Sequence, residues 1–231
     1  MIEIREDKKR PSLFWAHLDT GAKRPATKNL TPGKAVYNEQ MVTVKSHEYR
    51  IWDPHRSKLS AALLRGLTAY AFTPKSSVLY LGASSGTTAS HVSDLLNAGG
   101  HVYCVEFAPR VMRDLVQVSA TRKNMIPIMA DARYPESYLQ IPELVEVLYQ
   151  DVAQPNQAKI LVDNARRFLR PGGTAYVAIK ARSIDVTEKP SRIFDREEKT
   201  LAKAGFTVVD RISLDPYSAD HVFLSAVFGE V

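Results

Sequence analysis

Four residues that are capable of acid–base chemistry stand where predicted elements begin or end. Asp151 directly follows one predicted strand and Lys180 ends another, while His221 begins the last predicted strand. Lys58 begins a predicted helix. The carboxyl ends of parallel strands and the start of an antiparallel strand lie at one edge of a sheet, where open α/β folds hold their ligands. Each residue alone is more commonly a surface salt-bridge partner, but four at one edge indicate a catalytic group.

A lysine in such a group is a candidate general base. Partial burial and a second cation nearby both disfavour the charged form of a lysine, so some neutral amine can exist near neutral pH. The neutral amine could then remove a proton from a weakly acidic hydroxyl such as a ribose 2′-OH. That hydroxyl would attack a sulfonium methyl group in line. The sequence has no cluster of His, Asp and Glu at metal-ligand spacing, so we expect no metal ion.

A glycine-punctuated turn is the second chemical feature. It reads Gly82-Ala83-Ser84-Ser85-Gly86 after an apolar run, and Thr87 and Thr88 begin the next predicted helix. Such a turn presents backbone N–H groups and the positive end of a helix at the carboxyl edge of a sheet. We therefore expect a nucleotide-like ligand there.

Three interpretations of this turn are open. A dinucleotide-binding loop would have glycine where Ser84 stands, which weakens NAD or FAD as ligand. A serine hydrolase elbow matches Gly-x-Ser-x-Gly, with Ser84 as nucleophile and His221 downstream, but no His-Gly-Gly-Gly-like oxyanion loop precedes it. The third interpretation is the cofactor turn of a class I S-adenosylmethionine-dependent methyltransferase, which packs against the amino acid moiety of the cofactor.

Acidic residues at two further strand ends favour an adenosine-like ligand. Glu106 ends the next predicted strand, where a carboxylate can accept hydrogen bonds from both hydroxyls of a ribose. Asp131 and Ala132 follow the strand after that, from where a carboxylate and an N–H can reach an adenine edge. A lipase-like hydrolase has no use for Glu106. Three successive strand ends that supply a turn, a ribose acid and a base acid indicate one binding site.

The order of elements predicts an α/β fold. Repeated β-then-α units predict a parallel sheet with helices on both faces. The connection 214–220 is too short for a parallel crossover, so the last strand should be antiparallel. We expect strands at 77–82, 101–106, 125–128, 145–150, 173–180, 206–213 and 221–228, and helices at about 58–72, 87–98, 109–121, 155–169 and 191–204.

The N-terminal part differs in pattern and in charge. We predict a small β module at residues 1–53, with short strands at 2–5, 13–18, 42–44 and 49–52, followed by the main domain at 54–231. Of the formal charge of +6, residues 1–58 carry 12 Lys and Arg against 7 Asp and Glu. Aromatic residues alternate with these cations, which suits phosphates and stacked bases. A solvated basic face over core aromatics is the equally acceptable alternative.

The single cysteine, Cys104, excludes an internal disulfide and lies in an apolar run, so we expect a buried thiol. The sequence contains no run of 18 apolar residues, and its first residues lack the apolar core of a signal peptide. We therefore expect a cytoplasmic protein without a membrane segment.

Over essentially its whole length the sequence resembles the fibrillarin family, in its short archaeal form. The resemblance rests on the segments 48–59, 80–94, 105–110, 151–159, 179–187 and 217–221. It implies a class I S-adenosylmethionine-dependent methyltransferase fold, Rossmann-like, with a seven-stranded sheet whose last strand is antiparallel, plus the N-terminal β module. It also implies S-adenosyl-L-methionine as cofactor. The Gly/Arg-rich tail of the eukaryotic family pattern is absent, so the sequence does not support a nucleolar location.

The resemblance further implies site residues. The catalytic group carries over to Lys58, Asp151, Lys180 and His221, with Lys180 as general base, Asp151 positioning it, and the other two orienting the substrate and stabilising charge. The implied cofactor-binding residues are Gly82, Ser84, Gly86, Thr87, Thr88, Glu106, Phe107, Asp131, Ala132, Asp151, Val152, Ala153 and Gln154.

The activity so implied is 2′-O-ribose methylation of rRNA and tRNA targets, in a box C/D guide ribonucleoprotein. The implied partners are a Nop-domain scaffold protein, a kink-turn-binding protein of ribosomal type, the guide RNA and the target RNA. The alternatives are protein glutamine methylation, a serine hydrolase that uses Ser84, and a non-catalytic assembly subunit.

Overall fold

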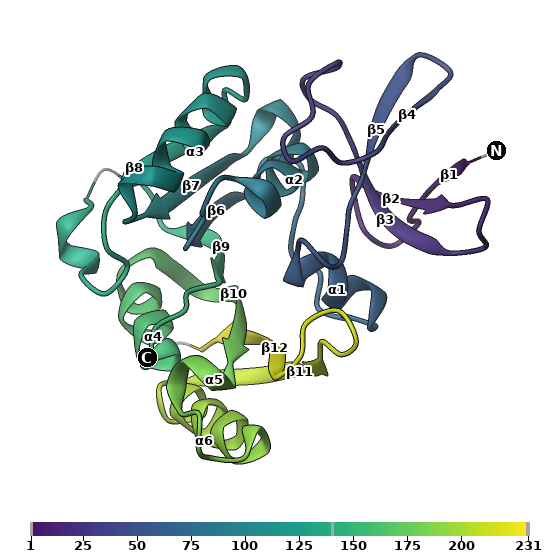
Figure 1. Ribbon diagram of the computed structural model, residues 1–231. Coiled ribbons are helices and arrows are strands. Elements are labelled where there is room, and N and C mark those ends of the chain that lie inside the picture. Colours follow the sequence, from purple (N-terminus) through teal and green to yellow (C-terminus); the bar gives the residue numbers. More distant parts are fainter. Residues whose placement is uncertain (1, 140, 230–231) are drawn as a thin grey trace.

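The apolar segments after residue 74 assemble into one seven-stranded sheet in a computed structural model of the protein, which describes residues 2–139 and 141–229 (Figure 1). The outer limits 1 and 231 of the two predicted domains lie outside the described residues. The strand order is β11-β12-β10-β9-β6-β7-β8. The strands are β6 (Ser77–Leu81), β7 (His101–Glu106), β8 (Met125–Met129), β9 (Val145–Gln150), β10 (Leu169–Lys180), β11 (Phe206–Ser213) and β12 (His221–Phe228).

The direction of the last strand is as predicted. Strands β10, β9, β6, β7 and β8 pair in parallel, whereas β12 is antiparallel to both β10 and β11. In the β10–β12 ladder Lys180 lies opposite His221, and in the β10–β9 ladder Val177 lies opposite Gln150. These two registers bring the candidate catalytic residues to one edge of the sheet.

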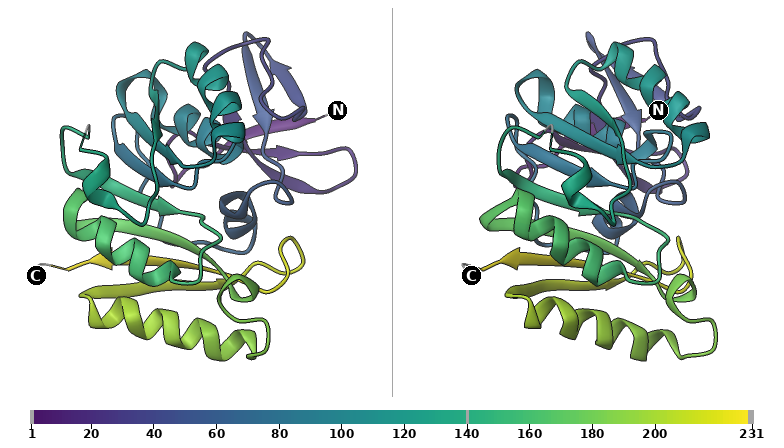
Figure 2. Two further views of the ribbon diagram at one scale, coloured as in Figure 1. Left: turned by 60° about the vertical axis from the view of Figure 1, so that its left-hand side comes forward. Right: turned by 90° about the vertical axis from the view of Figure 1, so that its left-hand side faces the viewer.

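Helices cover both faces of the sheet (Figure 2). The apolar side chains of α1, α2 and α3 pack into one cluster with one face, and those of α4 and α6 pack into a second cluster with the other. Alternation along each strand makes this possible, since Tyr80 enters the first cluster while Leu79 and Leu81 enter the second. The helices are α1 (Lys58–Leu64), α2 (Thr87–Leu96), α3 (Pro109–Thr121), α4 (Gln157–Phe168), α5 (Ala181–Ile184) and α6 (Pro190–Lys203), with short 3₁₀ turns η1 (Asn97–Gly99) and η2 (Pro135–Ser137).

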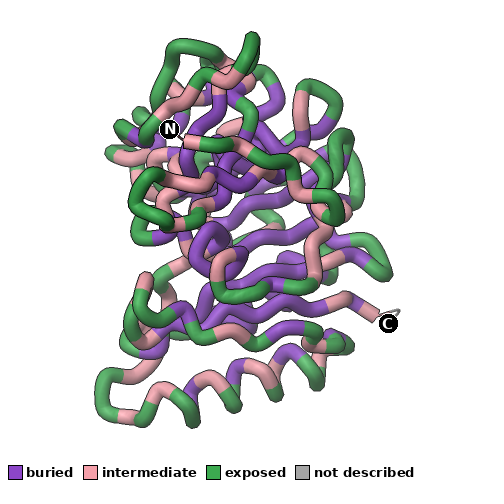
Figure 3. Tube along the Cα trace, turned by 90° about the vertical axis from the view of Figure 1, so that its right-hand side faces the viewer, coloured by how far each residue is buried: buried purple, intermediate pink, exposed green. Residues whose placement is uncertain are grey.

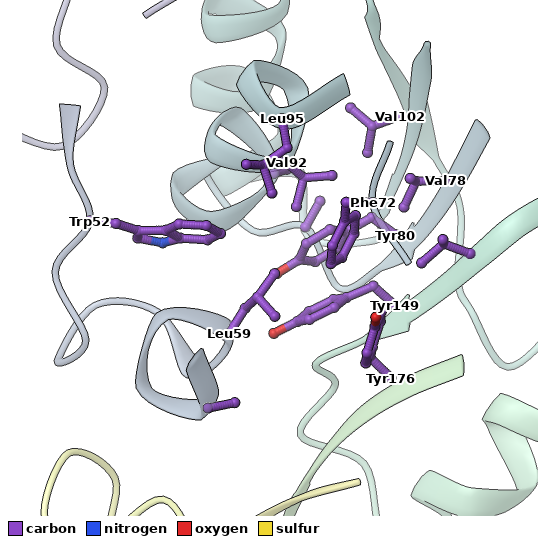
Figure 4. Packing of buried hydrophobic residues seen from close by; sticks show 14 of the residues in the cluster. Trp52, Leu59, Phe72, Val78, Tyr80, Val92, Leu95, Val102, Tyr149 and Tyr176 are labelled. Atoms are coloured by element: carbon purple, nitrogen blue, oxygen red, sulfur yellow. The ribbon is translucent and has the colours of Figure 1, made fainter. Parts of the chain in front are cut away.

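Aromatic rings form the centre of the first cluster. The ring centroids of Tyr80 and Tyr149 lie 4.5 Å apart, and Tyr176 continues the row on the next strand. Figure 4 shows these rings together with Trp52, which reaches the same cluster from the end of the N-terminal module. Figure 3 shows that burial follows the strands of the large sheet, while the outer side of α6 is exposed. The first cluster therefore contains residues of both sheets.

The N-terminal module is an antiparallel sheet of five strands in the order β1-β2-β3-β5-β4. Its strands are β1 (Glu3–Glu6), β2 (Leu13–His17), β3 (Lys23–Lys28), β4 (Met41–Val44) and β5 (His47–Ile51). Strand β3 was not predicted, because Pro25 has no N–H to donate and reads as a break. In the structure Pro25 precedes the residues of β3 that pair with β5, which begin at Ala26, so the proline is tolerated within the strand.

The first helix is shorter than predicted and ends at Leu64 instead of residue 72. Gly66 has a left-handed backbone, with φ +98°. Its N–H donates to the carbonyl of Leu63, and the N–H of Leu67 donates to the carbonyl of Ala62. This pair of bonds closes a helix C-terminus and favours glycine at that position. The sequence Arg65-Gly66-Leu67 was the available signal, and the helical spacing of the apolar residues concealed it.

A buried group of charges joins the two sheets. The carboxylate of Asp94, on α2, accepts hydrogen bonds from Arg50 of β5 (2.8 Å), from Thr27 of β3 (2.8 Å) and from Arg122. Arg50 also donates to Glu39 at 2.6 Å. The side chains of Arg50, Asp94 and Glu39 are fully buried and that of Arg122 is 1% exposed. Two arginines are thus neutralised by two carboxylates inside the protein.

Substitution of Asp94→Asn should destabilise the protein strongly, because it leaves two buried guanidinium groups with a single carboxylate. We expect the free energy of unfolding in urea to fall by about 3–5 kcal/mol. The matched control is Asp163→Asn, which breaks the exposed pair of Asp163 with Lys159 and should cost less than about 1 kcal/mol. Equal losses in the two variants would contradict a structural role for the buried charges.

Candidate active site

The four predicted acid–base residues meet at the carboxyl edge of the large sheet. Asp151 follows β9, Lys180 ends β10, His221 begins β12, and Lys58 is the first residue of α1. Ser57 caps this helix by accepting a hydrogen bond from the N–H of Ser60 (3.3 Å). The structure therefore places all four residues at the edge of the sheet where the sequence predicted them.

The ion pair within this group differs from the expected one. Nζ of Lys58 lies 2.8 Å from a carboxylate oxygen of Asp151, and both side chains are about a quarter exposed. We expected Asp151 to meet Lys180. Val177 is level with Gln150, so Lys180 lies two residues, or about 7 Å, further along its strand than Asp151. Lys180 is exposed instead of partly buried, and no carboxylate in residues 2–139 and 141–229 forms an ion pair with it.

His221 is buried and held in one tautomer. Its Nδ1 lies 2.7 Å from the carbonyl oxygen of Ala219, which can only accept, so Nδ1–H donates and Nε2 is free of a proton in the neutral ring. Burial lowers the pKa of His221, and the positive charges of Lys58 and Lys180 lower it further. The Ala219 hydrogen bond and the charge of Asp151 act in the opposite direction. The neutral imidazole of His221 is thus favoured by its surroundings, which include the side chains of Lys58, Lys180 and Asp151.

The glycine turn approaches this group from β6. Gly82 has φ +80°, and a Cβ atom there would overlap the carbonyl oxygen of Asp151 and crowd Val152. The N–H groups of Gly82 and Ala83 both donate to the carbonyl of Val105, at 2.9 and 3.1 Å. Only glycine permits this approach of the turn to the end of β9.

A pocket of about 290 Å³ opens beside the turn. It borders the carboxyl ends of β6, β7, β8 and β9. Among its lining are ten of the predicted cofactor residues: Gly82, Ser84, Glu106, Phe107, Asp131, Ala132, Asp151, Val152, Ala153 and Gln154. Val105, Ala130, Arg133 and Ile160 also line it and were not predicted. Ile160 comes from α4, and no local sequence signal shows that this helix reaches the pocket.

Glu106 connects the two loops that flank the pocket. Its carboxylate accepts hydrogen bonds from the N–H of Ser84 (2.9 Å) and from the N–H of Ala108 (2.8 Å). Asp131 is held by Arg133 at 2.6 Å, and hydrogen bonding from Arg133 lowers the pKa of Asp131. Both acids are therefore fixed before any ligand binds.

Three predicted cofactor residues do not line the pocket. Gly86 caps α2, and Thr87 and Thr88 form its first turn. Thr88 is buried, and its hydroxyl donates to Ser57 at 3.0 Å. This bond ties the start of α2 to the start of α1, and so to Lys58.

The hydrolase interpretation gains no support from the geometry. In the part of the chain that the structure describes, no hydrogen bond joins the hydroxyl of Ser84 to a histidine.

The same described part contains no group of three His, Cys, Asp or Glu side chains placed to hold a metal ion. None of its helices is both long enough and apolar enough to span a membrane. Cys104 is buried, which raises the pKa of its thiol well above the usual range.

Comparison with known proteins places this site in context. The fibrillarin family model matches residues 4–230. The fibrillarin-like rRNA/tRNA 2′-O-methyltransferase of Methanopyrus kandleri is 50% identical over 227 residues, which cover 98% of each chain.

Two solved structures are similar over nearly the whole chain. Aeropyrum pernix fibrillarin, solved with natively bound S-adenosyl-L-methionine, has a TM-score of 0.89 at 50% identity, covering 98% of this chain and 100% of that one. A chain from a fibrillarin/Nop5p complex has a TM-score of 0.84 at 36% identity, covering 96% of this chain and 99% of that one.

Substitution of Gly82→Ala should cost more than the strain of a left-handed backbone. Gly33→Ala is the matched control, because Gly33 has the same φ of +80° but a methyl group on its Cα would meet no atom within 4 Å. We expect Gly33→Ala to lower the free energy of unfolding by about 1 kcal/mol and Gly82→Ala by about 1–3 kcal/mol more. Equal values in urea unfolding would refute the close approach to Asp151.

The titration of His221 tests the charges around it. Its NMR midpoint should lie below 6.5, the ordinary histidine value. Lys58→Met removes a cation and should raise the midpoint, whereas Asp151→Asn should lower it further. Because the unfolded chain binds this proton more readily, the stability that His221 contributes is present above pH 6.5 and is lost as the pH falls through its folded pKa. A midpoint that is unchanged in Lys58→Met would contradict the placement of Lys58 near His221. The variant His221→Asn identifies the His221 signal in the spectrum, because that signal is then missing.

Proposed function

The chain belongs to the fibrillarin family, and on that premise we propose that it is an S-adenosyl-L-methionine-dependent rRNA/tRNA 2′-O-methyltransferase. The observation that carries this proposal is one residue, Asp151, which borders the adenosine-type pocket and also forms the ion pair of the acid–base edge. The fold of the chain is that of the S-adenosylmethionine-dependent methyltransferases. Neither protein glutamine methylation nor hydrolysis is favoured by any observation.

The pocket fits the cofactor by its chemistry. Gly82 lines it at the end of β6, where the absence of a side chain lets the turn lie against the backbone of Asp151. Glu106 provides a fixed carboxylate for the ribose hydroxyls, and Asp131 with Ala132 borders the place for the adenine. The stretch 151–154 borders the remaining side. When bound, the cofactor supplies a methyl group on a positively charged sulfur.

The residues of the edge then handle the proton of the target hydroxyl. Asp151 holds Lys58 as a charged ammonium, which orients the target and stabilises negative charge on its oxygen. Lys180 has no carboxylate partner among the described residues to favour its charged form, so it is the lysine that, as the neutral amine, takes the proton. His221 presents an unprotonated Nε2 to the same space and can accept a hydrogen bond from the target.

The partners follow from the same family. The fibrillarin of one solved complex binds Nop5p, and this chain uses a scaffold protein of that Nop-domain kind. A kink-turn-binding protein of ribosomal type and a box C/D guide RNA complete the particle, which selects the target nucleotide. The particle acts in the cytoplasm. Residues 1–53 serve as an accessory module to the catalytic domain 54–231.

Lys180→Met tests the proposed general base. In the particle reconstituted with guide RNA, target RNA and labelled cofactor, we expect 2′-O-methyl formation to fall by about 10²–10⁴-fold. Binding of S-adenosyl-L-methionine, measured by calorimetry, should be unchanged, because Lys180 does not line the pocket. The control is Lys189→Met, which removes a nearby exposed charge at the start of α6. Wild-type turnover by Lys180→Met would reject the assignment.

A further inference from the structure

Strand β10 extends beyond the end of its parallel neighbour β9. The parallel ladder between β9 and β10 ends where Gln150 pairs with Val177, while β10 continues to Lys180. On its other side Lys180 is still paired with His221 of β12. The backbone N–H and C=O of one strand residue point to the same side, so those of Lys180 face the place that β9 has already left. Unpaired, these two groups would leave the end of β10 free to fray.

A side-chain amide takes the place of the missing strand. The N–H of Lys180 donates to Oε1 of Gln157 at 2.9 Å, and Nε2 of Gln157 donates to the carbonyl of Lys180 at 3.3 Å. Gln157 is the first residue of α4 and is fully buried. Glutamine offers one acceptor and two donor hydrogens on one rigid plane, which matches the pair of groups on the strand. An aspartate, a glutamate or an aliphatic side chain could not satisfy both.

A second buried amide fixes the first. Nε2 of Gln150 donates to the backbone carbonyl of Gln157 at 2.8 Å, and Gln150 is also fully buried. Gln150 directly precedes Asp151. The two glutamines therefore connect the residue before Asp151 to the backbone of Lys180, and the strand pair connects Lys180 to His221. This connection adds to the strand pairing in linking Asp151, Lys180 and His221.

We propose that Gln157 is a positioning residue for methyl transfer, which holds the backbone of Lys180 and thereby places its amine. The proposal rests on the function proposed for Lys180. The Lys180 side chain is exposed and makes no ion pair among the described residues, so the backbone bonds to Gln157 are interactions that fix where this side chain starts. Misplacement of a reacting group by about 1 Å can cost about 10²-fold in rate.

The test compares Gln157→Leu with a variant that damages the same helix end without touching Lys180. Glu197 is buried and accepts the N–H of Ala158, the residue after Gln157, at 2.9 Å. Glu197→Leu is therefore the structural control. In the reconstituted particle we expect Gln157→Leu to lower kcat by about 10- to 100-fold with KM for S-adenosyl-L-methionine unchanged. Glu197→Leu should lose a similar amount of thermal stability and keep the wild-type kcat.

A second readout follows the position of the lysine directly. The charge of Lys180 is one cause of the low pKa of His221, so its displacement in Gln157→Leu should raise the NMR midpoint of His221, and Glu197→Leu should leave that midpoint in place. Should Gln157→Leu fail to fold, Gln157→Met keeps the unbranched shape, adds no charge and removes both hydrogen bonds to Lys180, so it should show the same two changes.

The outcomes separate the two proposals. Wild-type kcat and an unmoved His221 midpoint in Gln157→Leu, with Lys180→Met inactive, would overturn the positioning role alone. Equal losses of kcat in Gln157→Leu and Glu197→Leu would also overturn it, because the effect would then be one of general stability. Turnover by Lys180→Met would reject the base, and the His221 midpoint would still decide whether Gln157 holds Lys180.

Discussion

The carboxylate of Asp94 holds together parts of the chain that are distant in the sequence. It accepts hydrogen bonds from β3, from β5 and from the residue after α3, all inside the protein. Buried charges are tolerated only when every partner is in place, so this group permits one relative placement of the two sheets. The chain leaves β5 at Ile51 and reaches Lys58 seven residues later. The buried charges around Asp94 therefore help to determine where Lys58 lies at the edge of the large sheet.

The edge itself is a product of strand lengths. Strand β9 ends early and lets Asp151 turn toward α1, while β10 continues and carries Lys180 past it. The two lysines consequently differ, because Lys58 is paired with a carboxylate and Lys180 is exposed. Gly82 brings the cofactor turn against the backbone of Asp151. Asp151 thus lines the pocket and, through its side chain, pairs with Lys58 in the proposed acid–base group.

The local sequence pattern was sufficient to predict features that depend on one helix, one strand or one short connection. Apolar runs between helical segments located the strands of the large sheet, the short connection after β11 gave the direction of β12, and strand ends located Glu106 and His221. The pattern failed where a distant partner decides the outcome. Pro25 is tolerated within β3 because β2 pairs with the strand at that residue, while pairing with β5 begins only at Ala26. The Lys58–Asp151 contact depends on the offset between the ends of β9 and β10. The amide of Gln157 gave no signal, because a buried glutamine is recognisable only once its two partners are known.

Strand β12 lies between β10 and β11, although it follows both in the chain. During synthesis the sheet therefore has an empty slot until residue 228 has left the ribosome, and β11 has no strand to pair with before then. His221 arrives with that same strand. A chain without β12 would lack both an interior strand and His221, so one strand completes the large sheet and the proposed acid–base group together.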